Sequence, residues 1–289
     1  MLPATRPALN SNPTPVRNLR NSDTMGHMTE RHTSGPPLAF HHAGHGPNAT
    51  TGVAICHGFT GSPLSVLPWA EYLAAQGFAV SVPLLPGHGT SWQDLATTRW
   101  QDWYRTFEQS YLDLAGQTEK CFVAGLSMGG AVALRVASLH DVPGLVLVNP
   151  GLSFYDRRVR YVAALKYVMP TTTPIVEDKP APVSTEDGDY SKTPLKSVHE
   201  LKKLFRAATL GLPKVQAPAL VFKSSVDEVV PPSSVAAIER HIASSRLKVV
   251  TLPHSGHVAT LDVDAPAIFE QSASFFRQHA GDRVASESS

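Results

Sequence analysis

Short apolar runs alternate with amphipathic stretches along most of this 289-residue chain. Runs rich in Val, Ile and Leu are typical of buried strands, and stretches with apolar side chains on one face are typical of helices. The alternation predicts crossover connections, and therefore an α/β fold in which helices flank a mostly parallel sheet. The expected strands are residues 53–56, 78–82, 121–124, 145–148, 220–222 and 247–252, and the expected helices are residues 66–76, 100–115, 128–139 and 265–279. Residues 37–42 are expected to add an antiparallel edge strand.

One long segment, residues 151–210, interrupts the alternation. It contains five prolines and an acidic patch at residues 186–189, and no core strand is recognisable in it. Because an excursion of this length inside a compact domain is usually functional, we interpret it as a small cap, or lid. The cap would be inserted after the sixth strand, residues 145–148. A surface loop without regular structure is the alternative.

The two ends of the chain lack the composition of a packed core. Residues 1–35 are rich in Pro, Asn, Ser and Thr, and we expect a disordered N-terminal extension there. Residues 281–289 are expected to form a flexible tail. The α/β core is then expected to comprise residues 36–150 and 211–280.

Charge and cysteine content argue against several classes of function. The chain has 25 basic and 24 acidic residues without a dense basic stripe, so no nucleic-acid partner is expected. No stretch approaches the ~20 apolar residues of a membrane span, and no secretory signal is recognisable, so stable membrane insertion is not expected. Cys56 and Cys121 lie in apolar runs and are expected to be free core residues, which is compatible with a reducing, cytoplasmic location.

The sequence Gly125-Leu-Ser-Met-Gly129 is a G-x-S-x-G motif between an expected strand and an expected helix. In this context the serine occupies a tight strand-to-helix turn that lifts its hydroxyl clear of the sheet. Glycines stand two residues away on either side because side chains there would collide with neighbouring elements. Ser127 is therefore the expected nucleophile, and an ordinary glycine-rich turn is the alternative.

Two backbone N–H groups are expected to bind the oxyanion that forms when Ser127 attacks. The first N–H groups of a helix have no intrahelical partner and lie at the positive end of its dipole, which favours Met128. The second donor is expected from the loop that follows the 53–56 strand, at Phe59. His57, in the same loop, is expected to be structural rather than catalytic.

A neutral serine needs a general base, and 13 histidines compete for that role. His257 lies in the loop between the last expected strand and the final helix. The order serine, acid, then histidine near the C-terminus is the order that G-x-S-x-G sites of this kind use, so His257 is the expected base. His254 and His88 are the alternatives.

Asp227 is the expected acid. It follows the 220–222 strand, at the carboxyl end of a parallel strand, where catalytic groups gather. Its carboxylate would accept the imidazole N–H of the base and fix its tautomer. Glu228 is expected to point elsewhere, and Asp262 and Asp264 come after His257, against the chain order. A turn-forming role for Asp227 is the alternative.

The motifs in this order resemble the bacterial monoacylglycerol lipase and carboxylesterase family. The resemblance covers about residues 51–279 and rests on residues 57–63, 86–90, 125–130, 226–232 and 254–262. It implies the α/β-hydrolase fold, the triad Ser127, Asp227 and His257, and the oxyanion donors Phe59 and Met128. It also implies a small cap, no metal or organic cofactor, and hydrolysis of monoacylglycerols or of short- to medium-chain carboxylic esters.

The expected cap supplies the candidates for substrate binding. The resemblance implies that cap residues hold a glycerol head group, and Glu177 is the candidate. Leu152 and Phe154 are candidates for lining the acyl chain, together with Tyr155, Tyr161 and Leu165. Packing of the cap onto the core is the alternative role of these apolar residues.

Two other readings of the function remain open. A thioesterase, an amidase or a C–C hydrolase would use the same triad on the same fold. A receptor that binds a small molecule without turnover belongs to a different class, and it need not keep a working triad. A fluorophosphonate probe separates the two classes, because an enzyme should be labelled at Ser127 and a receptor with a dead site should not.

Overall fold

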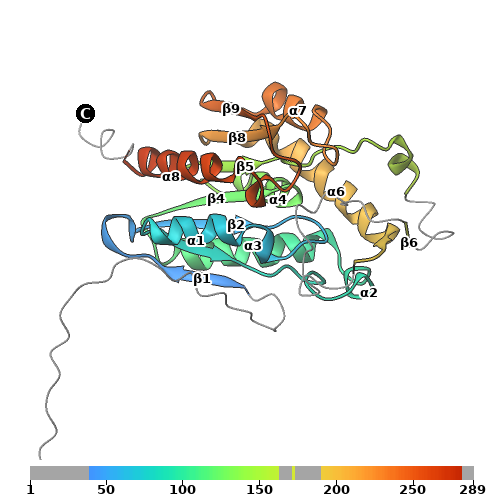
Figure 1. Ribbon diagram of the computed structural model, residues 1–289, viewed down its shortest axis with the longest axis horizontal. Coiled ribbons are helices and arrows are strands. Elements are labelled where there is room, and N and C mark those ends of the chain that lie inside the picture. Colours follow the sequence, from blue (N-terminus) through green and yellow to red (C-terminus); the bar gives the residue numbers. More distant parts are fainter. Residues whose placement is uncertain (1–38, 163–170, 173–189, 282–289) are drawn as a thin grey trace, which may run out of the picture. The chain divides into compact units, whose positions relative to one another are not determined.

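A seven-stranded sheet forms the centre of the computed structural model, which describes residues 39–162, 171–172 and 190–281 (Figure 1). The strand order is β1-β3-β2-β4-β5-β8-β9. Every neighbouring pair is parallel except β1 and β3, which are antiparallel with Phe40 opposite Val82. The strands are β1 (Phe40–Ala43), β2 (Thr51–Cys56), β3 (Ala79–Val82), β4 (Lys120–Leu126), β5 (Leu145–Val148), β8 (Ala219–Ser224) and β9 (Leu247–Leu252). The expected mostly parallel sheet is confirmed, and so is its antiparallel edge strand.

Helices cover both faces of this sheet, as the crossover connections require. One face is packed by α1 (Leu67–Ala75) and α8 (Ala265–Gly281). The other is packed by α3 (Trp100–Ala115), α4 (Met128–Ala137), α6 (Leu195–Gly211) and α7 (Ser233–His241). The side chains of β2 alternate between the two faces. Val53 and Ile55 belong to the core cluster on the face of α1 and α8, and Ala54 and Cys56 belong to the cluster on the face of α3 and α4. All residues of β2 are buried, which explains why central strands read as continuous apolar runs.

Short elements complete the described residues. They are α2 (Trp92–Leu95), the paired strands β6 (Thr171–Thr172) and β7 (Thr193–Pro194), and the 3-10 helices η1 (Gly46–Asn48), η2 (Pro63–Ser65), η3 (Arg157–Tyr161), η5 (Leu212–Lys214) and η6 (Ala259–Leu261). The sequence pattern did not predict α2 or α7. Both are short, and α7 buries only Val235 and Ile238 among its apolar side chains, so neither carries a long periodic signal.

The segment expected to form the cap starts directly after β5. That strand is the fifth among the described residues and not the sixth, and it is also the fifth of the strands that the sequence predicts up to residue 148. The helix α6 crosses the expected boundary at residues 210–211 and packs against α3 and α4. Its buried side chains Leu201, Leu204 and Phe205 belong to the core cluster of that face. The C-terminal part of this segment is therefore packed as part of the core.

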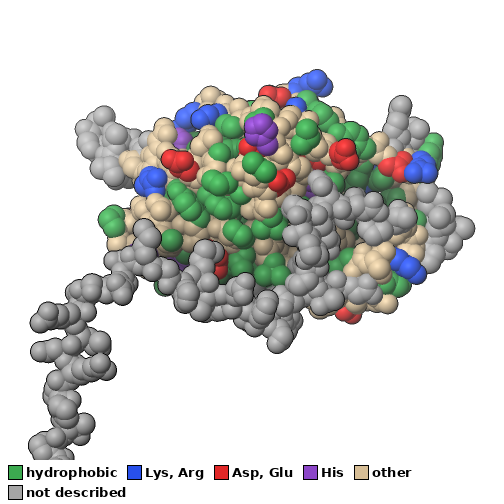
Figure 2. All heavy atoms as spheres, viewed as in Figure 1, with side chains coloured by type: hydrophobic (Ala, Val, Ile, Leu, Met, Phe, Trp, Pro, Cys, Tyr) green, Lys and Arg blue, Asp and Glu red, His purple; other side chains and the backbone are tan. Residues whose placement is uncertain are grey.

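Some expectations fall outside the described residues. The disorder expected for residues 1–35 does so, as does the flexible tail, except for Gly281, which ends α8. Residues 39–162, 171–172 and 190–281 include no helix long and apolar enough to cross a membrane. On the face shown in Figure 2, acidic and basic side chains of described residues are interspersed, and neither sign forms a continuous patch.

The packing of α6 predicts a contrast between two leucines of that helix. Leu204 is completely buried, whereas Leu210 is 69% exposed. Leu204→Ala should lower the free energy of unfolding by about 2–5 kcal/mol, because it removes buried apolar surface and leaves a cavity. Leu210→Ala, the matched control, should change it by less than about 0.5 kcal/mol. Urea denaturation followed by circular dichroism measures both, and equal values would show that α6 does not pack as part of the core.

Candidate active site

A strained turn at Ser127 joins β4 to α4. Ser127 has φ 57° and ψ −118°, a conformation that L-residues rarely adopt. A Cβ on Gly125 would lie 2.3 Å from the carbonyl carbon of Gly129, and a Cβ on Gly129 would lie 2.1 Å from the carbonyl oxygen of Cys56. A side chain at either position would therefore collide with neighbouring backbone, as the G-x-S-x-G pattern predicts.

The end of β5 and the loop after it hold this turn through backbone hydrogen bonds. The N–H of Ser127 donates to the carbonyl of Val148 at 3.0 Å, and the N–H of Gly151 donates to the carbonyl of Ser127 at 3.0 Å. Pro150 lies against the turn as well, since a Cβ on Gly130 would come within 2.8 Å of the Pro150 side chain. Both the backbone N–H and the carbonyl of Ser127 are therefore held by hydrogen bonds.

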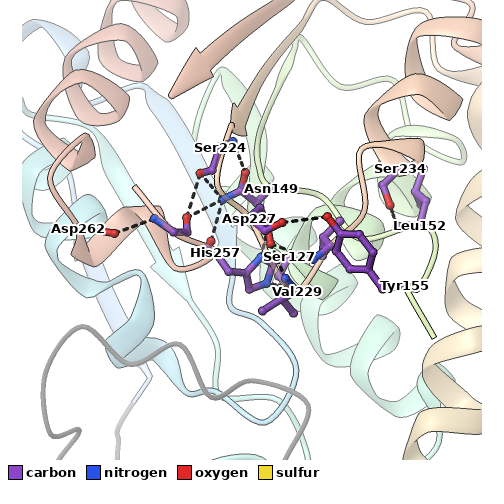
Figure 3. A network of polar contacts seen from close by, with 12 residues as sticks. Ser127, Asn149, Leu152, Tyr155, Ser224, Asp227, Val229, Ser234, His257 and Asp262 are labelled. Carbon is purple, nitrogen blue, oxygen red and sulfur yellow. Dashed lines mark hydrogen bonds and ion pairs between the residues drawn. The ribbon is translucent and has the colours of Figure 1, made fainter. Parts of the chain in front are cut away.

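Three of the predicted residues form one chain of hydrogen bonds (Figure 3). The Ser127 Oγ and the His257 Nε2 are 2.8 Å apart, and the His257 Nδ1 lies 2.8 Å from the Asp227 Oδ2. The His257 side chain is 2% exposed and that of Asp227 is 7% exposed. The carboxylate holds the Nδ1–H tautomer, which leaves Nε2 free to accept the Ser127 proton. This arrangement can activate a serine hydroxyl for attack on a carbonyl carbon.

The loop after β8 sets the orientation of Asp227. The other carboxylate oxygen, Oδ1, accepts the backbone N–H groups of Val229 at 2.8 Å and Val230 at 2.9 Å. The hydroxyl of Tyr155, in the segment after β5, donates to the Asp227 carbonyl at 3.0 Å. Glu228 is exposed, as expected. The carboxylate therefore combines the turn-forming role, which was the alternative, with the contact to His257.

The two carboxylates that follow His257 in sequence support its loop. The Asp262 Oδ2 accepts the N–H of Gly256 at 2.8 Å, and the Asp264 Oδ2 accepts those of His254 and Ser255 at 2.9 Å. Burial opposes ionisation of Asp264, but these N–H groups and the Ser255 hydroxyl outweigh it and lower the pKa of the carboxyl. His254 itself, one of the alternative bases, is exposed.

The loop expected to hold an oxyanion donor passes beside the serine. A Cβ on Gly58 would lie 3.5 Å from the Cβ of Ser127, so the backbone that leads to Phe59 is close to the hydroxyl. Phe59 is buried, and Thr60 after it has φ 57°. Met128 is the first residue of α4. The two predicted donors thus flank Ser127, one in the loop after β2 and one at the N-terminus of the helix.

Two buried histidines pack behind this loop. The N–H of Leu85 donates to the His57 Nε2 at 3.2 Å, so the proton is on Nδ1, which donates to the Gly58 carbonyl at 2.9 Å. Burial lowers the pKa of His57 to about 4, even though the hydrogen bond to Gly58 opposes this. Burial, and then the charge of His57, lower the pKa of His88 to about 3. His88, the second alternative base, contacts the rings of His57, Phe59 and Trp103.

The expected substrate-contacting residues are only partly placed. Leu152 is buried, and its N–H donates to the Ser234 Oγ at 3.1 Å, while the Phe154 ring lies 4.9 Å from that of Phe205 in α6. These contacts pack the segment onto the core. Glu177 and Leu165 lie outside the described residues.

One functional candidate, Asn149, was missed by the sequence analysis. Its side chain lies directly after β5 and contacts the backbone of His257 (Figure 3). A polar residue at the carboxyl end of a parallel strand is a signal that could have identified it. Among the described residues, no three His, Cys, Asp or Glu side chains are grouped so that they could hold a metal ion.

A sheet of this topology, with a serine at the β4–α4 turn and the histidine and aspartate in loops after later strands, defines a serine hydrolase of the α/β type. The chain belongs to the hydrolase family described as serine aminopeptidase, S33, which it matches over residues 47–264.

Individual relatives of the chain are named as lipases and esterases. A thermostable monoacylglycerol lipase of Bacillus sp. (strain H-257) is 37% identical over 244 residues, which are 81% of this chain and 93% of the relative. A carboxylesterase of Bacillus subtilis (strain 168) is 23% identical over 78% of this chain and 92% of its own length. A solved structure from work on LipS and LipT, two metagenome-derived lipolytic enzymes, has a TM-score of 0.77 and 31% identity, covering 84% of this chain and 98% of that one. The resemblance expected from the motifs is confirmed.

The buried histidines predict how stability depends on pH. In the folded chain the pKa of His57 is lowered to about 4 and that of His88 to about 3, both below the ordinary value of 6.5. Below about pH 6.5 the unfolded chain therefore binds more protons, so the free energy of unfolding should decrease as the pH falls from about 7 to about 5.

His88→Phe keeps a ring between Phe59 and Trp103 and removes one of these groups. Its free energy of unfolding should therefore decrease less steeply over the same pH range. Urea titrations at several pH values measure the slope. His241→Phe, at an exposed position of α7, controls for the loss of a histidine. A slope for His88→Phe as steep as that of the wild type would contradict the assignment of a buried neutral imidazole.

Proposed function

We propose that the chain is a serine esterase that hydrolyses carboxylic esters, namely monoacylglycerols and short- to medium-chain acyl esters, through an acyl-enzyme on Ser127. The hydrogen-bonded chain from Ser127 through His257 to Asp227, with 2.8 Å at each step, is the observation that carries the proposal. The similarity to a monoacylglycerol lipase and to a carboxylesterase supports the choice of ester substrates.

In the first half of the reaction, the Ser127 Oγ attacks the ester carbonyl while His257 accepts its proton through Nε2. Asp227 stabilises the imidazolium that forms and does not take up a proton itself. The backbone N–H groups of Phe59 and Met128 hold the oxyanion, a contribution for which removal of one donor typically costs about 10²–10³ in rate. His257 then protonates the leaving alcohol as the C–O bond breaks.

Water completes the turnover in the second half. It loses a proton to His257 as it attacks the acyl carbon of the Ser127 ester. The tetrahedral intermediate collapses, the carboxylic acid leaves, and the Ser127 oxygen recovers its proton from His257. The proposed steps use protein groups and water alone.

The substrate is proposed to bind beneath a cap formed within residues 151–210, which were expected to be inserted into a core of residues 36–150 and 211–280. The last helix of this segment, α6, is counted with the core because its buried side chains pack there. Glu177 is the proposed contact of a glycerol head group, and Leu152 and Phe154 are proposed to line the acyl chain. The partner is thus a small uncharged ester and not a nucleic acid, in keeping with the balance of 25 basic and 24 acidic residues. A reducing, cytoplasmic location is also part of the proposal, supported by the free, buried Cys56 and Cys121.

A second candidate function is hydrolysis of an amide bond. The description of the matched family as serine aminopeptidase favours it, because the same triad serves both reactions. The two relatives named for ester hydrolysis favour the ester. Turnover of aminoacyl anilides in parallel with the esters discriminates between these candidates.

Substitutions in the proposed triad should abolish turnover without unfolding the protein. Ser127→Ala should lower kcat for p-nitrophenyl butyrate by about 10⁶, because no nucleophile remains. Asp227→Asn should lower it by about 10⁴, because the amide favours the wrong imidazole tautomer. Ser110→Ala, a serine of α3 that bonds Ser81, is the control and should keep wild-type kcat. Unchanged turnover by purified Ser127→Ala would exclude the mechanism.

A matched substrate panel tests the proposed head group. 1-Monoacylglycerols and ethyl esters of the same acids, from butyrate to palmitate, are compared by kcat/KM. The glycerol esters should be hydrolysed at least about tenfold faster at equal chain length, since hydrogen bonds to a substrate hydroxyl discriminate strongly. Glu177→Gln should reduce this ratio, whereas Glu239→Gln, at an exposed position of α7, should preserve it. Equal rates for both series would instead define a general carboxylesterase.

A further inference from the structure

A buried carboxamide connects the proposed catalytic histidine to the centre of the sheet. Asn149 follows β5 directly, and it is 2% exposed. Its Nδ2 donates to the carbonyl of His257 at 2.8 Å and to that of Gly256 at 3.3 Å. Its Oδ1 accepts the backbone N–H of Ser224 at 2.8 Å. One side chain therefore joins the ends of β5 and β8 to the loop that carries the imidazole (Figure 3).

Ser224 forms a second hydrogen-bonded connection between Asn149 and the same loop. Its Oγ accepts from the Asn149 Nδ2 at 2.9 Å and donates to the Gly256 carbonyl at 2.9 Å. Ser224 is also buried. The carbonyls of Gly256 and His257 thus receive hydrogen bonds from a small network whose two side chains, Asn149 and Ser224, are both buried.

The backbone at Asn149 is strained. Its φ of 44° lies in the left-handed region, where glycine is favoured and asparagine is the side chain best tolerated. The backbone N–H donates to the Phe222 carbonyl at 2.9 Å, which holds this conformation against β8. A glycine would relieve the strain but would remove the hydrogen bond that the Asn149 Nδ2 donates to the carbonyl of the buried His257. The strain therefore indicates that the carboxamide itself is needed.

The residues on either side of Asn149 in sequence bind the backbone of Ser127, the proposed nucleophile. Val148, just before it, accepts the N–H of Ser127, and Gly151, two residues after it, donates to the Ser127 carbonyl. A single stretch of four residues, 148–151, thus binds the backbone of Ser127 on one side and that of His257 on the other. It therefore connects the backbones of the two residues whose side chains, Ser127 Oγ and His257 Nε2, are hydrogen-bonded.

We propose that Asn149 is a positioning residue of the hydrolytic site, which fixes the imidazole of His257 relative to the Ser127 hydroxyl through the backbone of the histidine loop. The inference rests on the proposed triad and adds a residue to it. The hydrogen bonds of the Asn149 side chain go to Ser224 and to the backbone of the histidine loop and not to the reacting atoms, so its effect is expected on the rate of the chemical step and not on substrate binding. A displacement of about 1 Å between catalytic groups can cost about 10²-fold in rate.

Asn149→Asp is the sharpest test because the two side chains have the same shape. The carboxylate still accepts the Ser224 N–H, but it places an oxygen against the carbonyls of His257 and Gly256 in place of the donating Nδ2. We expect kcat for p-nitrophenyl butyrate to fall about 10- to 100-fold while KM stays within about twofold. Labelling of Ser127 by a fluorophosphonate should slow by the same factor.

Asn48→Asp is the matched control, since the Asn48 Nδ2 also donates to a carbonyl, that of Gln76, at 2.8 Å, but in an exposed position. It should keep wild-type kcat. Ser224→Ala removes the second path and should lower kcat about three- to tenfold, again at constant KM. It also decides the question if Asn149→Asp does not fold.

The outcomes separate the two proposals. Wild-type protein that is not labelled at Ser127 overturns the proposed function. Labelled wild type together with wild-type kcat in folded Asn149→Asp, or in Ser224→Ala where Asn149→Asp does not fold, overturns the role of Asn149 and leaves the triad intact. A rise in KM with unchanged kcat likewise contradicts a positioning role.

Discussion

The close packing of α4 against the ends of β2 and β4 is the constraint on which the whole site depends. Every residue of α4 except Arg135 is buried, so the helix has no solvent face along which it could shift. At its first turn, Gly129 approaches the Cys56 carbonyl so closely that no Cβ fits. This contact forces the chain to turn at Ser127, with a backbone strain of about 1–3 kcal/mol that the surrounding core must offset.

The parallel order of the central strands explains how groups distant in sequence meet. Because β2, β4, β5 and β8 are parallel neighbours, their carboxyl ends lie along one edge of the sheet. The loop that contains Phe59, the residue Ser127, Asn149 and Asp227 each follow one of these strands. The His257 loop follows β9 at the edge of the sheet, so it must reach toward the centre. Carboxylates of Asp262 and Asp264 and the carboxamide of Asn149 hold its backbone there.

The sequence was sufficient for those parts of the fold that have a strong local signal, and it predicted three residues that the structure brings into one hydrogen-bonded chain. The G-x-S-x-G motif combines glycine sterics with a strand-to-helix boundary, and strands such as β5 are continuous apolar runs. The position of α6 was missed although its apolar spacing at Val198, Leu201 and Leu204 is visible. The nearby prolines and the absence of a strand suggested a segment separate from the core. Asn149 carries only the weak signal of a polar residue directly after a parallel strand, and its partners lie 75 and 108 residues away.

The histidines show why residue type alone does not identify a catalytic base. His57 and His88 are as buried as His257, but they contact backbone groups and aromatic rings, and burial lowers the pKa of each. The neutral imidazoles of His57 and His88 hold their loops in place, and among the described residues neither ring is hydrogen-bonded to a hydroxyl that it could deprotonate. His257 differs in what its two nitrogens face, a carboxylate on one side and the Ser127 hydroxyl on the other. Those partners come from loops after two other strands, so the sheet topology determines which of the buried histidines can act as a base.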